Sequence, residues 1–159
     1  MDKPFSVGDW IHTEKYEGTI EDITFRSTRI RTADNSVVTI PNSILSNEVI
    51  ANWSKLEKRK IEISLRLPLE TKAQELEILS KKFKIVLENN KDILEDSIQV
   101  DVNKIKEDNI EISIVLYTSI TEYNKFLNIK QEININILKI LEAEGIRLAY
   151  PGRNVYVQK

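Results

Sequence analysis

Hydrophobic residues change their spacing near residue 60. In residues 5–54 they come in short extended runs separated by turn residues, and one longer run shifts its alternation of apolar and polar positions. In that run Ile20 is even-numbered, Ile23 and Phe25 are odd-numbered, and Ile30 is even-numbered again. A strand whose apolar side chains change face must bulge or bend sharply, as strands of small barrels do. The pattern predicts a small bent β-barrel with Ile23, Phe25 and Ile30 in its core.

The strand predicted at Val37–Ile40 runs directly into Pro41. Proline has no N–H to donate to a sheet, so the strand should end there. Asn42 and Ser43 follow, and both residue types are favourable N-caps, so we expect one of them to cap a short helix. Before this strand, Asp34–Asn35 predicts a tight turn because Asn tolerates positive φ.

From residue 61 onward, the spacing of apolar residues alternates between two, which is typical of strands, and 3.6, which is typical of helices. Strict alternation predicts strands at residues 61–67, 98–102, 110–114 and 146–150. One helix is predicted between the first two strands and another between the last two. The order β-α-β-β-α-β is that of the ferredoxin-like sandwich.

Both predicted helices have a continuous apolar face. The first begins with a capping box formed by Thr71 and Gln74, and the second ends at Gly145, which suits the C′ position. The apolar faces consist of Leu76, Leu79, Phe83 and Val86 in the first helix, and of Ile129, Ile133, Ile137 and Leu141 in the second.

The change in spacing divides the chain into two domains and a tail, and the fold class is α+β. We expect residues 1–57 to form a β domain and residues 58–152 an α/β domain. The charged segment 55–60 should link them, because it shows no apolar periodicity. Residues 153–159 would form a separate terminal strand.

The composition leaves little support for enzyme chemistry. The chain has no cysteine, which removes thiol catalysis, disulfides and cysteine-bound zinc. Its single histidine, His12, has no Ser or Asp arrangement tied to it, so we expect an exposed loop residue. Phosphate-binding glycine motifs are absent from the sequence. We therefore predict no enzyme activity, no catalytic residue, no metal site and no cofactor.

The sequence gives little support for membrane insertion or RNA binding. No apolar run approaches the roughly 20 residues that span a bilayer, and no signal peptide is visible. Small barrels and βαββαβ domains bind RNA in several families, but the expected central strands carry only Tyr117 for base stacking. Because the net charge is −2, the basic residues are better explained as interface or solvated charges: Arg26, Arg29, Arg31, Lys55, Lys58, Arg59 and Lys60. We expect no nucleic-acid partner, and a soluble adaptor or RNA-binding protein remains the alternative.

Several stretches of the sequence carry a family likeness. PFSVGDWI and EGTIEDITFRSTRIRTADNSVVTIPNSILSNEVIANWS resemble the soluble core of the small-conductance mechanosensitive channel family (MscS-like), and EGIRLAYPGRNVYV resembles its C-terminal signature. The resemblance covers nearly the whole chain, although Asn35 replaces the usual turn glycine. The matching positions are Pro4, Phe5, Gly8, Asp9, Gly18, Thr28, Arg31, Asp34, Ile40, Pro41, Asn42, Asn52, Ser54, Gly145 and Pro151.

The resemblance implies the cytoplasmic vestibule of a channel that opens under membrane tension in hypo-osmotic shock and releases ions and small solutes. It implies an Sm-like or SH3-like barrel followed by a ferredoxin-like domain. In that family, transmembrane helices precede the Pro4–Phe5 segment and attach the vestibule to the cytoplasmic side of a bacterial or archaeal membrane. This portion would be soluble without them.

The same resemblance implies assembly of the vestibule as a ring of seven subunits. The Pro41–Asn42 corner would then be a structural joint. Val155, Tyr156 and Val157 would lie in a strand that pairs with the other subunits in a small parallel barrel.

Overall fold

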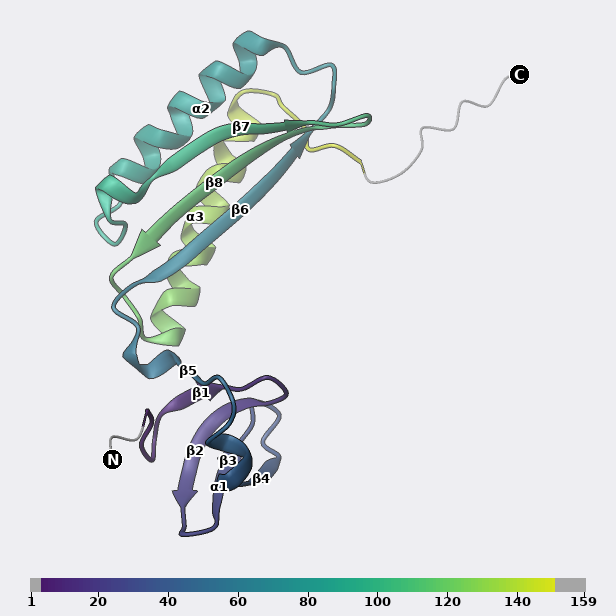
Figure 1. Ribbon diagram of the computed structural model, residues 1–159. Coiled ribbons are helices and arrows are strands. Elements are labelled where there is room, and N and C mark those ends of the chain that lie inside the picture. Colours follow the sequence, from purple (N-terminus) through teal and green to yellow (C-terminus); the bar gives the residue numbers. More distant parts are fainter. Residues whose placement is uncertain (1–3, 151–159) are drawn as a thin grey trace. The chain divides into compact units, whose positions relative to one another are not determined.

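The computed structural model describes residues 4–150 (Figure 1). Contacts within the chain divide it into two compact units between Leu56 and Glu57. We call residues 4–56 the β unit and residues 57–150 the α/β unit. No helix within the described residues is both long enough and apolar enough to cross a membrane.

The β unit is a five-stranded antiparallel sheet with one short helix. Its strand order is β4-β3-β2-β1-β5, so β4 and β5 are the outermost strands. The elements are β1 (Trp10–His12), β2 (Glu17–Ile23), β3 (Ser27–Arg31), β4 (Val37–Pro41), α1 (Asn42–Leu45), β5 (Ala51–Asn52) and the 3-10 helix η1 (Trp53–Lys55).

The run that shifts its alternation is two strands rather than one. β2 and β3 form a hairpin whose turn contains residues 24–26. β2 does bulge, between Ile20 and Asp22, and Ile30 is fully buried as predicted. The prediction for Phe25 is wrong: its side chain is 96% exposed, because it lies at the tip of the turn.

The apolar core of the β unit is small. Gly18 in β2 permits a very close approach of β3, because a Cβ at this position would lie 2.4 Å from the carbonyl oxygen of Arg31. Ile23 is only half-buried and packs against the edge of the core. The buried members are Phe5, Ile11, Ile20, Ile30, Ile40 and Leu45.

The α/β unit is a three-stranded antiparallel sheet of order β6-β8-β7, with both helices packed on one face (Figure 1). Alternate residues of β8 are buried, including Ile110, Ile112 and Ile114 as predicted. The elements are β6 (Arg59–Leu67), α2 (Ala73–Glu88), the 3-10 helix η2 (Glu95–Ser97), β7 (Gln99–Ile105), β8 (Ile110–Thr118) and α3 (Tyr123–Ala143).

The helices bury the predicted faces with small corrections at their ends. α2 starts later than expected, because the backbone N–H of Lys72 donates to Glu75 (3.1 Å) and the predicted box of Thr71 and Gln74 does not form. Leu87, four residues after Phe83, completes the buried face in place of Val86. The predicted residues of α3 are all buried: Ile129, Ile133, Ile137 and Leu141.

Gly145 ends α3 as predicted. Its φ is +66°, and the N–H of Ile146 donates to the carbonyl of Leu141 (3.0 Å), the hydrogen bond of a Schellman motif. The strand expected at 146–150 does not form. A single backbone bond, from Ala149 N–H to the Arg66 carbonyl (2.8 Å), joins this segment to β6. The structure therefore shows the order β-α-β-β-α, with the last segment lying along β6 without a ladder.

The segment expected to link the domains is shorter than predicted. Arg59 and Lys60 are the first residues of β6, so only residues 56–58 lie between η1 and that strand. Pro151 and the proposed tail strand with Val155, Tyr156 and Val157 fall outside the described residues, and their roles stay predictions.

Candidate functional site: polar joints and a hollow in the β unit

Most of the motif residues lie in the β unit and join segments that are far apart in the sequence. Phe5 and Ile40 are core residues, and Gly8 has a φ of +95°, which favours glycine. The polar motif residues form what we call the N-terminal joint, the corner joint and the turn joint. Gly145 is the only one of the described motif residues in the α/β unit.

The N-terminal joint fixes the start of the described chain against β5. The Asn52 side-chain amide donates to Asp9 Oδ2 (2.8 Å) and to the Pro4 carbonyl (3.0 Å). The Asn52 carbonyl oxygen accepts from Ser54 N–H (3.0 Å), and the Ser6 N–H donates to Asp9 (2.9 Å). The bonds from Asn52 and Ser6 stabilise the carboxylate and hold the pKa of Asp9 below its usual value.

The corner joint differs from the prediction for Asn42 and Ser43. Pro41 is the N-cap of α1, and no side chain caps this helix. Asn42 is instead turned toward the β2–β3 hairpin, where its side chain has other partners. The expectation that Asn42 or Ser43 caps the helix is therefore wrong.

Asn42 satisfies the backbone of the β2–β3 turn. Its amide nitrogen donates to the carbonyls of Thr24 (2.9 Å) and Phe25 (3.2 Å), and its backbone N–H donates to the carbonyl of Arg26 (2.8 Å). Its side-chain oxygen accepts from the hydroxyl of Thr28 (2.7 Å), which is fully buried. These bonds hold the turn in one conformation, with Phe25 fully displayed to solvent.

The turn joint ties β2, β3 and the β3–β4 turn together. The Arg31 guanidinium donates to Glu21 (2.6 Å), at the bulge of β2, and to the Asn35 carbonyl (3.0 Å). The hydrogen bonds between these two side chains, helped by their opposite charges, lower the pKa of Glu21 and raise the pKa of Arg31. Asn35 has the predicted positive φ, +71°. Asp34 accepts from the hydroxyls of Thr32 and Ser36, which lowers its pKa.

His12 is a strand residue of β1 and not an exposed loop residue. Its ring is stacked on Trp53 with 4.3 Å between the ring centroids, and its Nε2 accepts from the indole N–H of Trp10 (3.1 Å). Its Nδ1 lies 3.0 Å from a carboxylate oxygen of Glu17. Because the indole only donates, this geometry places the imidazole proton on Nδ1. Each polar atom of His12 thus has a structural partner.

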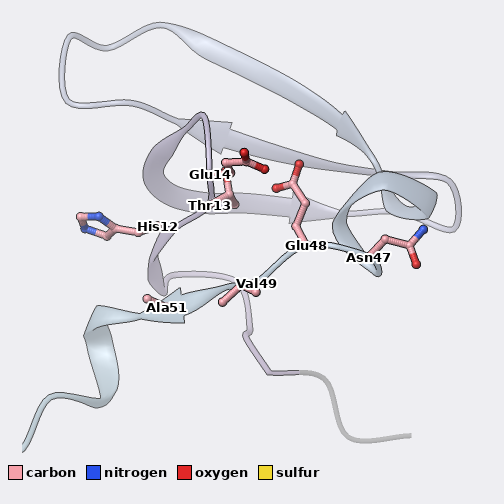
Figure 2. Close-up of a pocket in the computed structure, with 7 residues that line it drawn as sticks. All are labelled: His12, Thr13, Glu14, Asn47, Glu48, Val49 and Ala51. Atoms are coloured by element: carbon pink, nitrogen blue, oxygen red, sulfur yellow. The ribbon is translucent and has the colours of Figure 1, made fainter.

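A hollow of about 510 Å³ lies between the β1–β2 turn and the connection from α1 to β5 (Figure 2). Figure 2 shows the side chains of Glu14 and Glu48 extending the same way, one from each wall, while His12 points away from them. Val49 is 90% exposed, and one carboxylate oxygen of Glu48 is buried without a hydrogen-bond partner. The lining residues are His12, Thr13, Glu14, Asn47, Glu48, Val49 and Ala51.

The hollow combines carboxylates with apolar surface. The described residues contain no group of three His, Asp or Glu side chains that could hold a metal ion. The hollow can instead accept a cationic or amphipathic group. Sequence reasoning missed it because its walls come from two loops far apart in the chain, neither of which has a recognisable motif.

Comparison with known protein families explains why the motif residues occur together. Residues 1–55 match the family model described as mechanosensitive ion channel, beta-domain, and residues 61–148 match that described as mechanosensitive ion channel MscS, C-terminal. The chain belongs to the MscS family of mechanosensitive ion channels. The family resemblance inferred from the sequence is confirmed, and this is a family of channels, not of enzymes.

Two MscS relatives align with nearly all of this chain but with less than half of their own length. A Bacillus subtilis protein, the uncharacterized MscS family protein YhdY, is 39% identical over 99% of this chain and 43% of its own length. The small-conductance mechanosensitive channel MscMJ of Methanocaldococcus jannaschii is 31% identical over 100% of this chain and 45% of its own length.

Solved MscS-family structures share the fold. Arabidopsis thaliana MSL1, determined by cryo-EM, superposes with a TM-score of 0.85 at 23% identity, over 93% of this chain and 54% of that one. The crystal structure of Helicobacter pylori MscS in a closed state gives a TM-score of 0.81 at 21% identity, over 98% and 60%. These likenesses support the mixed α/β architecture with antiparallel sheets.

Proposed function

We propose that this chain is the cytoplasmic vestibule of a mechanosensitive channel. The channel would open when membrane tension rises in hypo-osmotic shock, and ions and small solutes would leave the cell through it. The vestibule would lie on the cytoplasmic side of a bacterial or archaeal membrane, attached through membrane helices outside this chain.

The observation that carries the proposal is the match to two channel domains that follow each other along the chain. The two family models follow each other within 159 residues, and a relative named as a small-conductance mechanosensitive channel aligns with the chain from end to end.

We further propose that copies of the chain assemble as a ring of seven. In this proposal the β unit is an Sm-like barrel, and the α/β unit is a ferredoxin-like domain in which residues 146–150 lie beside β6. The bond from Ala149 to Arg66 supports that position for the segment. Residues 153–159, with Val155, Tyr156 and Val157, would supply one strand per copy to a closing barrel.

The polar motif residues would act as structural joints of this ring. Each joint fixes a backbone segment by side-chain hydrogen bonds, which are directional and so set position as well as stability. The Pro41–Asn42 corner is one such joint, because it positions the exposed β2–β3 turn.

The RNA-binding alternative gains no support from the side chains that suggested it. Arg29 and Arg31 lie beside the carboxylate of Glu21, at 3.7 and 2.6 Å. The ammonium of Lys58 lies 4.4 Å from the centre of the Tyr117 ring, where a base would have to stack. The vestibule is therefore the function that the geometry supports best.

A chimeric channel tests the proposal. This chain would replace the matching segment of the M. jannaschii small-conductance channel, and tension-activated currents would be recorded from membrane patches of cells lacking their own channels. We expect currents under suction and survival of a hypo-osmotic shift. A chimera that reaches the membrane but gives no current, while the intact relative does, would refute the proposed function.

A further inference from the structure

The single histidine of the chain, His12, lies where side chains from three elements meet. Trp10 and His12 are two residues apart in β1, so their side chains lie on the same face of that strand. Glu17 is the cross-strand partner of His12 on β2. Trp53 begins η1 directly after β5, which pairs with β1 on its other side. Strand pairing therefore brings two indoles, one imidazole and one carboxylate together.

The contacts around the imidazole suit its neutral form. The indole N–H of Trp10 donates to Nε2 of His12 (3.1 Å), and Nδ1 lies 3.0 Å from a carboxylate oxygen of Glu17. The ring is stacked on Trp53 with an angle of 16° between the two planes. In a neutral ring that accepts at Nε2 and donates at Nδ1, all of these contacts are favourable. The side chain of His12 is 29% exposed, so protons from water can reach it.

A protonated imidazole would satisfy only part of this arrangement. Both of its nitrogens carry hydrogen, and an indole can only donate, so the hydrogen bond between Trp10 and His12 would be lost. The contact with Glu17 would become a charge-assisted hydrogen bond, and the stack on Trp53 would gain a cation–π attraction. Protonation would therefore release one partner of the ring and strengthen the contacts with the other two.

The charged groups around His12 come from the elements that contact β1, which are β2, β5 and η1, and from the adjoining loops. Figure 2 shows His12 pointing away from the two carboxylates of the hollow. Among the described residues only Glu17 forms an ion pair with His12. The titratable residues of these elements and loops are Glu14, Lys15, Tyr16, Glu17, Glu48 and Lys55, with Glu21 and Asp22 toward the other end of β2.

We propose that His12 is a pH-sensitive latch of the β unit. The neutral ring holds the indole of Trp10, and the protonated ring releases it while holding Glu17 and Trp53 more tightly. Histidine changes charge between about pH 5 and 8, so the latch responds to physiological changes of pH. It lies beside the N-terminal joint, because the backbone N–H of Trp10 donates to the hydroxyl of Ser54 (2.9 Å). The latch belongs to the β unit itself and goes beyond the proposed channel function.

NMR spectroscopy tests the latch in the full chain, which contains two tryptophans and one histidine. With labelled indole nitrogens the wild type should give two indole N–H signals, and Trp10→Phe identifies the signal of Trp10. This signal should shift between about pH 8 and 5 with the same midpoint as the ring signals of His12. In His12→Phe, which keeps an aromatic ring against Trp53, it should be independent of pH over this range. Unchanged circular dichroism would show that the variants fold.

Glu17→Gln distinguishes a latch from a histidine that only titrates. The amide oxygen can still accept from Nδ1, but the charge that stabilises the protonated ring is gone. The transition of the Trp10 signal should therefore move to lower pH by roughly 0.3 unit or more, a twofold change in proton affinity. Glu14→Gln is the matched control, because Glu14 lies in the adjacent turn and forms no ion pair with the described residues. It should leave the transition in place.

Three results would overturn the latch. The first is a Trp10 signal that stays constant while the His12 ring titrates, and the second is one that shifts equally in His12→Phe. The third is a transition that Glu17→Gln does not move. None of these results bears on the channel chimera, which decides the proposed function separately.

Discussion

The two units of this chain are stabilised in different ways. The α/β unit buries a large apolar cluster that combines the faces of α2 and α3 with one face of its sheet. The β unit has a much smaller apolar cluster, and its separate segments are tied by the N-terminal, corner and turn joints. Apolar burial is non-directional, whereas hydrogen bonds fix the position of each group. The comparison suggests that the α/β unit supplies bulk stability and the β unit supplies precise surface geometry.

The same substitution at two phenylalanines should separate the units most clearly. Phe83→Ala removes a fully buried side chain from α2 and should cost about 3–5 kcal/mol. Phe25→Ala removes an exposed one and should change stability by less than about 0.5 kcal/mol. Both tryptophans lie in the β unit and the long helices in the α/β unit, so urea unfolding followed by fluorescence and by circular dichroism reports each unit. A loss above about 1 kcal/mol for Phe25→Ala would contradict the exposed position of this side chain.

A methyl group at Gly18 should damage only the β unit. Gly18→Ala places a Cβ against the carbonyl of Arg31 and should cost about 1–3 kcal/mol in the fluorescence-detected transition. Gly8→Ala is the control, because its Cβ would meet nothing within 4 Å and only its positive φ is strained. That strain should cost about 1 kcal/mol. Equal effects of both changes would mean that β3 can move away from Gly18.

Loss of the corner joint should loosen the β2–β3 turn while sparing the α/β unit. Asn42→Ala removes the hydrogen bonds to Thr24 and Phe25 and leaves the buried Thr28 hydroxyl without its acceptor. The expected cost is about 1–3 kcal/mol in the fluorescence transition, with faster amide hydrogen exchange in residues 24–27. Asn47→Ala, which removes one exposed bond to Ser43, is the control. If Asn42→Ala left the hydrogen-exchange protection of residues 24–27 unchanged, the hairpin would keep its conformation without the Asn42 hydrogen bonds.

Acid should destabilise the β unit more than the α/β unit. We expect this effect to be smaller than those of the substitutions above. The pKa values of Asp9, Glu21 and Asp34 are lowered by hydrogen bonds in the β unit, whereas Glu111 is the one such acid resolved in the described α/β unit. A carboxyl group whose pKa is lower in the folded than in the unfolded chain stabilises the fold at pH values above its unfolded-state pKa, which is about 4. This stabilisation is lost as the pH falls through the folded-state pKa. The urea midpoint from fluorescence should therefore drop more between pH 5 and about 3 than that from circular dichroism. Asp9→Asn should reduce the drop, and a larger fall in the circular dichroism midpoint would reverse the comparison.

The sequence predicted the features that local pattern determines. The apolar faces of both helices, the alternation of β8, the positive φ of Asn35 and the end of α3 at Gly145 follow from spacing and residue type alone. The position of Phe25 does not. Residues 24–26 contain no Gly, Pro or Asn to indicate a turn, and their carbonyls are satisfied by Asn42, which lies 17 and 18 positions away from Phe25 and Thr24.

The candidate site shows the same division. Motif residues could be named from the sequence, but their joints depend on pairings across the sheet, such as Asn52 with Pro4 at a separation of 48 residues. The segment 146–150 alternates in sequence yet forms one backbone bond to β6, because alternation does not ensure a pairing partner along its whole length. The hollow has no local signal at all, since it exists only where two loops meet.

The orientation of Asn42 also gives the β unit a chemical weak point. Asn42 is followed by Ser43, and hydrolysis of its side-chain amide would leave a carboxylate in place of the NH₂ group that faces the carbonyls of Thr24 and Phe25. A carboxylate only accepts hydrogen bonds, so its oxygen would repel the carbonyl oxygens of Thr24 and Phe25 instead of donating to them. Aged protein would thus carry a loosened β2–β3 turn while the apolar cores of both units stayed as they were.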